Sequence, residues 1–539
     1  MKKSLLILIL LFIISLIVGC NAETTSENNN DQKETNDGVQ NEDDESEDEN
    51  DAGGVLKIGW NSLPSALDPH ITTDSGPRNI GPNIFETLVT VNANNEIEPM
   101  LAESYEISDD GKIITFLLRE GVQFHNGEEM KAEDVVASMQ RWQEFSSAAK
   151  SELGESTWEA ADEYTVILNV ENPSYVLVES LAVLTQFPAI MPKEIIEAAD
   201  ETGVKEYVGT GPFKFEELKQ DQYIKLVKFD NYTPLSNTSG GLAGKKEALV
   251  DELYFYHVPD TATRVSGLIS GEYDVIPEVE LDAVPQLESS NEVNLMHATI
   301  GIETINFNKQ KGLFTDVRAR DAVNLAIDKE AIMTSILTNS DYFELDPSLV
   351  TKVNTTWYSD AGMDEYEKYD PDEAKKLLEE VGYDGEEIRI IVTKESMFQY
   401  QGAIPLQEQL QNIGMNVKLD IMDYPTWLDN RKDPDKWELV IHSWSPQPTP
   451  LQYLFLDSKA DYPGWTNSAE IDEHLKNIRA SQTQESAKEE YEKLQTTFWK
   501  EKPVIVVGHY SQLDALSNKV EGYEMFMNVP IFWNTSIED

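Results

Sequence analysis

Residue types that usually carry out catalysis or bind metals are sparse in this 539-residue sequence. Seven histidines stand at positions 70, 125, 257, 297, 442, 474 and 509, and no two have the helical spacing of paired zinc ligands. There is no Gly-x-Ser-x-Gly elbow, and GTGPF at Gly209 lacks the Lys-Ser/Thr of a phosphate-binding loop. With 98 Asp and Glu residues, no particular pair of carboxylates identifies an acid–base couple. The sequence therefore predicts no catalytic residue, no metal ligand and no cofactor.

The one thiol, Cys20, suits chemistry of another kind. It follows a positively charged start and an apolar run that ends at Val18 and is shorter than the ~30 Å hydrocarbon core of a bilayer requires. Such a start is typical of a secretory signal. The residues up to Gly19 resemble the lipobox of bacterial lipoproteins, whose cysteine is acylated on sulfur. We predict a signal peptide over residues 1–19 and a lipidated Cys20, in preference to an incidental unpaired thiol.

The residues after Cys20 are predicted to be a spacer. Residues 21–52 hold thirteen Asp or Glu, one Lys and no aromatic residue. Such a segment buries too little apolar surface to offset its ordering entropy, so we expect 20–52 to be an acidic disordered tether, with an interaction tail as the alternative. The net charge of the whole chain is −56, which excludes the basic footprint that nucleic-acid binding needs.

Beyond Gly53 the pattern is mixed α/β and long enough for two or three domains. Residues 110–124 read as a strand pair with Ile114, Phe116 and Leu118 on one face. Residues 131–142 switch to helical spacing. In the second half, residues 370–383 specify a helix, because an Asp-Pro start and a Gly near its end are helix boundary signals.

Several segments, in the right order, resemble the extracytoplasmic solute-binding proteins of family 5, which serve peptide and nickel ABC importers. The longest is EPMLAESYEISDDGKIITFLLREGVQFHNGEEMKAEDVVASMQRW, at residues 98–142. Shorter ones are LDPH, IFETLV, VGTGPFKF, RVSGLISGEYDV, VRARDAVNLAIDKE, YDPDEAKKLLEEVGYDG and IFWNTS. Ordered blocks over most of the chain make a chance match improbable. His125 lies in the longest block and is expected to stabilise a turn there.

The resemblance implies an α/β, two-lobed periplasmic-binding-protein-like fold of type II, in the large cluster with an extra subdomain. A hinge joins the lobes, and closure around the ligand follows from hinge rotation. The expected first lobe is 53–300, with an inserted subdomain at about 96–205. The expected second lobe is 301–504, and residues 505–539 return to the first lobe.

The resemblance also implies that ligands bind between the lobes, through main-chain hydrogen bonds, aromatic walls and charged groups that meet the peptide termini. Polar loops in the first half and two aromatic segments in the second supply the candidates. Glu303 interrupts an apolar stretch, so it can meet a ligand amine or end a strand in solvent. The predicted ligand-binding residues are Asn61, Ser62, Asp74, Glu303, Tyr424, Trp427, Trp444 and Ser445.

One departure from the family pattern bears on the ligand. Dipeptide binders of this family carry an acidic cluster after the Trp that corresponds to Trp444, whereas here no carboxylate precedes Asp457. Glu303 or Asp74 takes that role, or the ligand lacks a free α-amine. Longer or modified peptides, opines, glutathione-like compounds, sugar conjugates and nickel chelates all stay open.

The resulting prediction is an exported substrate-binding lipoprotein on the outer face of the cell membrane. It captures peptides or peptide-like solutes as a monomer and delivers them to ABC permease subunits and, through these, to ATPase subunits. A surface hydrolase such as a glycosidase, and a sensory receptor on the same scaffold, are the alternatives. A hydrolase would turn its substrate over, whereas a binding protein captures its ligand stoichiometrically.

Overall fold

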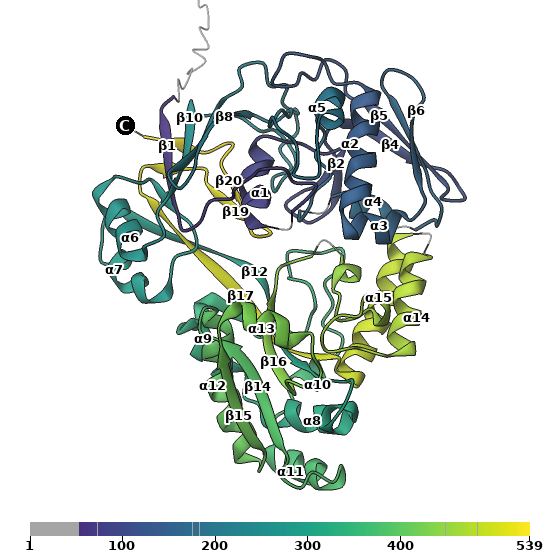
Figure 1. The fold of residues 1–539 in the computed structure, drawn as a ribbon, viewed down its shortest axis with the longest axis vertical. Helices are drawn as coiled ribbons and strands as arrows, with labels where there is room; N and C mark the ends of the chain where they lie inside the picture. The colour runs from purple at the N-terminus through teal and green to yellow at the C-terminus, as the bar shows by residue number, and fades with distance from the viewer. Residues whose placement is uncertain are drawn as a thin grey trace, which may run out of the picture. The chain divides into compact units, whose positions relative to one another are not determined.

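Two long antiparallel strands, β12 (Val293–Phe307) and β17 (Val504–Ser517), pair along most of their length and join two lobes (Figure 1). The computed structural model describes residues 53–538, except Thr73, Tyr175, Val183, Pro448 and Gln482. The predicted signal peptide, Cys20 and the spacer lie outside the described residues. We call the elements between β12 and β17 in sequence the second lobe, and the remaining described elements the first lobe.

An eleven-stranded sheet within the described residues continues from one lobe into the other through these two strands. Its order is β15 (Asn416–Met422), β14 (Glu387–Thr393), β16 (Leu439–Trp444), β12, β17, β11 (Val275–Ile276), β1 (Val55–Trp60), β10 (Glu252–His257), β9 (Tyr223–Lys228) and β8 (Phe213–Lys219), with β13 (Phe343–Glu344) beside β17. The first residues of β12 pair with the end of β17, which pairs on its other side with β11 of the first lobe. The last residues of β12 pair with β16 of the second lobe. The crossing strands are therefore shared by both lobes.

The β12–β17 ladder is irregular where it passes between the lobes. Its register shifts between Thr299 and Gly301 and again between Glu303 and Thr304. Bulges of this kind bend a strand and increase its twist. The lobe boundaries expected from the sequence lie at residues 301 and 505. β12 continues through residue 301, and β17 starts at Val504, so these boundaries stay a prediction.

A smaller sheet and its helices form the part of the first lobe between about residues 96 and 205. The sheet order is β4 (Ala102–Ile107), β5 (Ile113–Leu118), β7 (Thr165–Asn169) and β6 (Thr157–Ala160). The inward side chains of β5 are Ile114, Phe116 and Leu118, which confirms the alternation read from the sequence. The predicted strand pair within residues 110–124 is wrong, because residues 119–124 form no named strand and β5 pairs with β4 and β7 instead. The helices are α2 (Ala132–Phe145), α3 (Ser147–Leu153), α4 (Leu177–Ser180) and α5 (Lys193–Glu197).

His125, next to this sheet, stabilises a turn as expected. The backbone N–H of Gly209 donates to its Nδ1 at 3.2 Å, and its Nε2 donates to the carbonyl of Gly211 at 3.0 Å. Burial lowers the pKa of His125 to about 4, so the ring is neutral.

Helices cover the sheet of the second lobe. They include α8 (Val317–Ala326), α9 (Lys329–Leu337), α11 (Pro371–Glu380), α12 (Met397–Asn412), α13 (Tyr424–Arg431), α14 (Ala469–Arg479) and α15 (Gln484–Glu501). The start of α11 follows the sequence signals, since the Asp370 side chain accepts from the Glu373 N–H at 3.0 Å and Pro371 occupies the first turn. Just past its end, Gly382 has φ +77°, a value that favours glycine.

Candidate functional site

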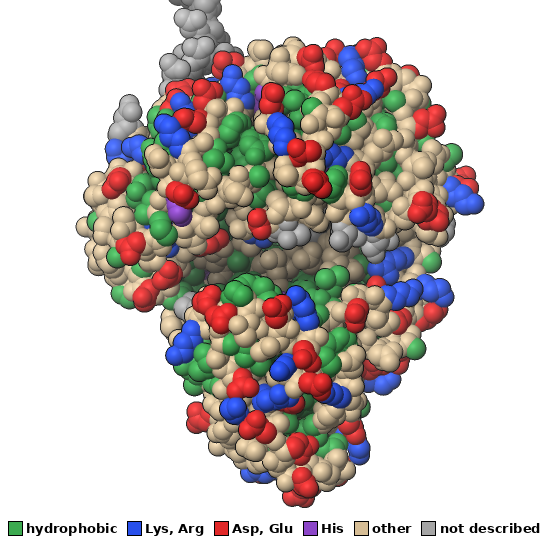
Figure 2. All heavy atoms as spheres, in the orientation of Figure 1, with side chains coloured by type: hydrophobic (Ala, Val, Ile, Leu, Met, Phe, Trp, Pro, Cys, Tyr) green, Lys and Arg blue, Asp and Glu red, His purple; other side chains and the backbone are tan. Residues whose placement is uncertain are grey.

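A cavity of about 580 Å³ lies between the lobes, against the crossing strands. The first lobe contributes the turn after β11, Glu278 to Leu281. The second lobe contributes the segment after β14, including Glu395 and Phe398, and the start of α13 at Tyr424. Ile300 of β12 and Tyr510 of β17 complete the wall. Figure 2 shows a hollow between the two lobes.

Parallel strand pairs bring the polar groups of each lobe together. Because β1 and β11 are parallel, the residues that follow them meet, and Asn61 Nδ2 donates to Glu278 Oε2 at 3.0 Å. In the second lobe β14 is parallel to β15 and β16. There the Tyr424 N–H donates to Glu395 Oε1 at 3.1 Å. The cavity thus lies at the carboxyl ends of parallel strands, where open α/β sheets bind their ligands.

Glu303 lies directly behind this wall. Its carboxyl group is fully buried and accepts from Ser443 Oγ, which lines the cavity. Its other oxygen, Oε1, is buried and has no hydrogen-bond partner among the described residues. Burial raises the pKa of Glu303 to about 8, so the group is mostly protonated at neutral pH.

Arg431 supplies a guanidinium group next to the second-lobe wall. It lies over the ring of Trp427 at 4.8 Å and that of Tyr462 at 5.2 Å, and its Nη1 is 3.4 Å from His442 Nε2. Within the described part of the chain, its buried Nε has no hydrogen-bond partner. Burial, with Arg431 nearby, lowers the pKa of His442 to about 3. His442 is therefore a neutral acceptor for the guanidinium.

The predicted ligand-binding residues occupy different depths around this cavity. Tyr424 lines it, Asn61 holds Glu278 in its wall, and Glu303 stands behind Ser443. Ser62 and Asp74 lie on exposed parts of the surface. These positions bring Asn61, Tyr424 and Glu303 to one cleft.

The aromatic candidates of the second lobe are mainly packing residues. Trp427 is 1 % exposed, packs in a small core with Trp437, and stacks on Tyr424 at 5.7 Å. Trp444 is partly buried, and its Nε1 donates to Thr304 Oγ1 at 3.2 Å. The carbonyl of Ser445 accepts from the side chain of Gln447. Ligand contact by these residues stays a prediction.

Several cavity residues escaped the sequence reasoning, among them Glu278, Glu395, Ser443 and Tyr510. Glu278 and Glu395 each stand two residues beyond the end of a strand. Polar residues that closely follow predicted strands were therefore the feature of the sequence that could have indicated these cavity residues. In a chain with 98 acidic residues, that signal is weak without knowledge of which strands are parallel.

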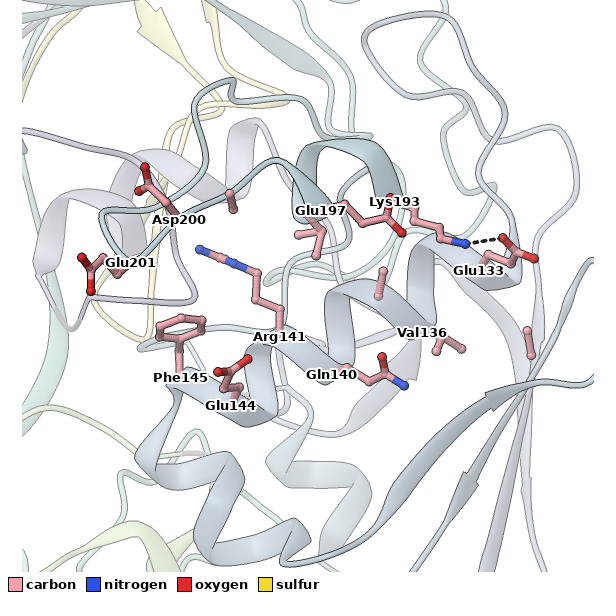
Figure 3. A pocket seen from close by; sticks show the side chains of 14 residues that line it. Glu133, Val136, Gln140, Arg141, Glu144, Phe145, Lys193, Glu197, Asp200 and Glu201 are labelled. Atoms are coloured by element: carbon pink, nitrogen blue, oxygen red, sulfur yellow. Dashed lines mark hydrogen bonds and ion pairs between the residues drawn. The ribbon is translucent and has the colours of Figure 1, made fainter.

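A second cavity, of about 600 Å³, lies between α2 and α5, on the surface of the part of the first lobe between about residues 96 and 205 (Figure 3). Its two basic groups are already paired. Arg141 bonds Asp68 through both terminal nitrogens, at 2.6 and 3.1 Å. Lys193 bonds Glu133 at 2.7 Å, the pair that Figure 3 joins by a dashed line. The interlobe cavity, with groups from both lobes, is the better candidate site.

This fold and interlobe cleft define a solute-binding protein. The chain belongs to the bacterial extracellular solute-binding proteins of family 5, whose sequence pattern matches residues 96–463. The family consists of extracytoplasmic binding proteins of ABC transporters rather than enzymes. In the described part of the chain, no helix has the length and apolar character needed to cross a membrane.

Individual proteins are similar to this chain over most of their length. The chain is 26% identical over 494 residues to the probable peptide ABC transporter periplasmic-binding protein y4tO of Sinorhizobium fredii, covering 87% of this chain and 91% of the relative. It is 25% identical over 504 residues to the oligopeptide-binding protein AppA of Bacillus subtilis, covering 88% and 89%. The structure of AgaA from A. tumefaciens R10 in complex with agropinic acid is similar with a TM-score of 0.73 and 26% identity, covering 90% of this chain and 99% of AgaA.

Proposed function

We propose that this protein captures peptides or peptide-like solutes between its lobes and delivers them to the permease subunits of an ABC importer. The observation that carries the proposal is the interlobe cavity, in which strand-end polar groups from both lobes meet aromatic side chains. A site of this size and composition suits a small organic solute. The relatives' names support peptides, and the agropinic acid complex supports peptide-like compounds.

Capture in this cleft requires no covalent chemistry. Hydrogen-bonding groups on the strand ends orient the solute, and Tyr424 and Phe398 provide apolar contact. Rotation about the crossing strands closes the lobes over it. The closed form then presents surfaces of both lobes to the permease. The permease can therefore distinguish the ligand-bound protein from the empty one by its shape. The protein works as a monomer in this scheme.

Anchoring through Cys20 and an acidic tether belongs to the same proposal. A lipid on the sulfur would hold the binding unit at the outer face of the membrane, close to the permease. Cys20→Ser should release the protein into the medium, as measured by fractionation and immunoblotting. Retention of the variant in the membrane fraction would contradict the anchor.

Native mass spectrometry of the full chain, purified in mild detergent from cells grown on peptone, tests the capture function. A bound peptide mass that disappears on unfolding is expected. Protein that carries no solute, and gains none when incubated with peptone, would contradict peptide capture. Conversion of a bound peptide to a product would instead favour a hydrolase.

A further inference from the structure

We propose that a hairpin of the first lobe acts as a stop behind the crossing strands and limits how far the cleft opens. The hairpin consists of β19 (Glu524–Phe526) and β20 (Val529–Ile531), and β19 contacts β12 (Figure 1). The inference rests on the lobe rotation that the proposed function uses. It gives residues outside the cleft control over the fraction of empty protein that is closed.

A further cavity, of about 220 Å³, lies on the face of the crossing strands opposite the cleft. His509 of β17 lines this back cavity, whereas the next residue, Tyr510, lines the interlobe cavity. Because successive side chains of a strand point to opposite faces, the two cavities lie on opposite sides of the ladder. A rotation about these strands that opens one side therefore closes the other.

Both lobes line the back cavity. The first lobe contributes the hairpin tip, Met525–Met527, and the second lobe contributes Thr351–Val353. Close by, Thr355 Oγ1 of the second lobe donates to the carbonyl of Asn94 of the first lobe at 3.4 Å. The lobes thus already touch on this side, and wider opening of the cleft would press the hairpin tip against the second lobe.

The hairpin tip has a backbone that places a bulky side chain at this meeting point. Met527, with φ +47°, and Asn528, with φ +64°, form the two-residue turn between the paired Phe526 and Val529. Two left-handed residues in succession match the twist of a tight hairpin, and asparagine suits them better than methionine does. Met527 nevertheless lines the cavity and is only 9% exposed. Residues in such a conformation persist where packing imposes it, and they gather at switch regions.

The surface that faces the hairpin is attached to the crossing strands. Glu344 of β13 pairs with His509 of β17, and Lys352 Nζ lies 2.8 Å from the Glu344 carboxylate. The next side chain, Val353, is 55% exposed and lines the cavity. Packed protein surfaces resist compression, so contact between these two surfaces sets a limit to rotation.

A limit on opening changes how tightly the cleft holds its solute. The apparent dissociation constant is the intrinsic one divided by the fraction of protein in the binding-competent form. Removing the widest-open forms raises the closed fraction of the empty protein. Bulk in the back cavity should therefore strengthen solute binding, and loss of bulk there should weaken it.

The test measures the width of the cleft with two spin labels and double electron–electron resonance. Asp282→Cys places one label on the first lobe and Asp429→Cys places the other on α13, and both positions are exposed. The full chain carries Cys20→Ser, which removes its one natural thiol. Protein dialysed free of solute gives the distance between the labels across the cleft.

Two variants change the back cavity in opposite directions. Met527→Gly removes the side chain and keeps the turn, since glycine adopts positive φ without cost, and the label distance should lengthen. Val353→Trp adds bulk behind the ladder, and the distance should shorten. The second variant keeps the inference testable if Met527→Gly fails to fold, as judged by its thermal melt.

The matched control is Asp221→Gly, at another hairpin tip. Asp221 also has a positive φ, +58°, but it is exposed between β8 and β9 and does not line the back cavity. Its substitution should leave the label distance unchanged. Unchanged distances in both cavity variants, or an equal shift in Asp221→Gly and Met527→Gly, would overturn the inference.

Incubation with peptone, followed by native mass spectrometry, separates the stop from solute capture. We expect a larger solute-bound fraction in Val353→Trp and a smaller one in Met527→Gly. Shifted distances with an unchanged bound fraction would overturn the effect on affinity. Shifted distances in a protein that captures nothing from peptone would contradict the capture proposal and support the stop.

Discussion

Two of the places where the described parts of the lobes meet differ in kind. At the crossing strands the contact is a backbone ladder between β12 and β17. Elsewhere the second lobe meets the part of the first lobe between about residues 96 and 205 through side chains. There Trp357 Nε1 donates to Glu179 Oε2 at 3.0 Å, and Arg479 lies 3.5 Å from Glu152. Arg479 is the last residue of α14, and Glu152 and Glu179 lie in α3 and α4, which Figure 1 shows away from β12 and β17.

The backbone ladder joins the two lobes, whereas the side-chain contact can only hold them close to each other. A backbone ladder persists through most side-chain substitutions, and its bulges increase the twist of the strands between the lobes. The second contact depends on a few side chains, which a rotation of the lobes can break and remake. We therefore expect substitutions at the ladder to affect folding, and substitutions at the second contact to affect how far the cleft opens.

The largest effect is expected from Gly301→Ala, within the ladder. A Cβ at Gly301 would lie 2.2 Å from the carbonyl oxygen of Trp444 and 2.7 Å from the ring of Tyr510. Since backbone cannot move aside easily, the free energy of unfolding should fall by about 3 kcal/mol. Urea titration followed by tryptophan fluorescence measures this loss.

The matched control is Gly402→Ala, in helix α12. There the new Cβ would meet only side-chain atoms of Ile336 and Ile441, at 3.0 Å or more. Alanine is also the better helix former, by about 1 kcal/mol. Equal destabilisation by the two substitutions would show that the crossing strands are no more constrained than an ordinary helix.

A second effect concerns Glu303, next to the bulge in the ladder. Its pKa is raised from 4.5 to about 8 by burial, so the folded state holds a proton that the unfolded state releases. The stabilisation by that proton is complete below pH 4.5 and is lost as the pH rises towards 8. Between pH 6 and 7.5 this residue should lower the free energy of unfolding by about 2 kcal/mol.

Glu303→Gln removes this titration and keeps the shape of the side chain. Its unfolding free energy, measured in urea at several pH values, should fall less steeply with pH than that of the unchanged protein. Parallel pH profiles for the two proteins would show that Glu303 is ionised in the folded state, and the ladder would then hold a buried charge.

Glu303 and Glu278 illustrate what the sequence could tell. An acid inside an apolar stretch is visible in a sequence, and Glu303 was singled out for that reason. Its partner Ser443 depends on the pairing of β12 with β16, strands separated by more than a hundred residues. The left-handed backbone of Glu278 leaves no trace in the residue type, because glutamate rarely adopts it.

The fold was more accessible than the site. Local patterns predicted β5 and α11 correctly, since alternation and capping depend on neighbours in sequence. The two-lobed fold came from ordered family motifs. The aromatic candidates were harder, because tryptophan serves both cores and clefts, and Trp427 proved to be packed behind Tyr424.

At the second contact, Trp357→Phe should have a smaller effect on stability than the ladder variant. The ring still packs against Tyr491, but Glu179 loses its donor. Burial raises the pKa of Glu179 to about 7. Loss of the hydrogen bond should lower the free energy of unfolding by about 1 kcal/mol. Because the bond joins the lobes, small-angle X-ray scattering without ligand should show a larger radius of gyration. An unchanged radius would mean that this bond does not hold the cleft.

The smallest effect is expected from Arg479→Ala, at the same contact. Arg479 and Glu152 approach only to 3.5 Å, and the arginine side chain is 31% exposed, so solvent and salt screen the pair. The free energy of unfolding should change by less than about 0.5 kcal/mol. Combining Arg479→Ala with Trp357→Phe sharpens the comparison, because two contacts that act together across one opening should show a coupled effect on the radius of gyration. Purely additive changes would mean that the two contacts respond to lobe rotation independently, and that the second meeting place of the lobes is not a single unit.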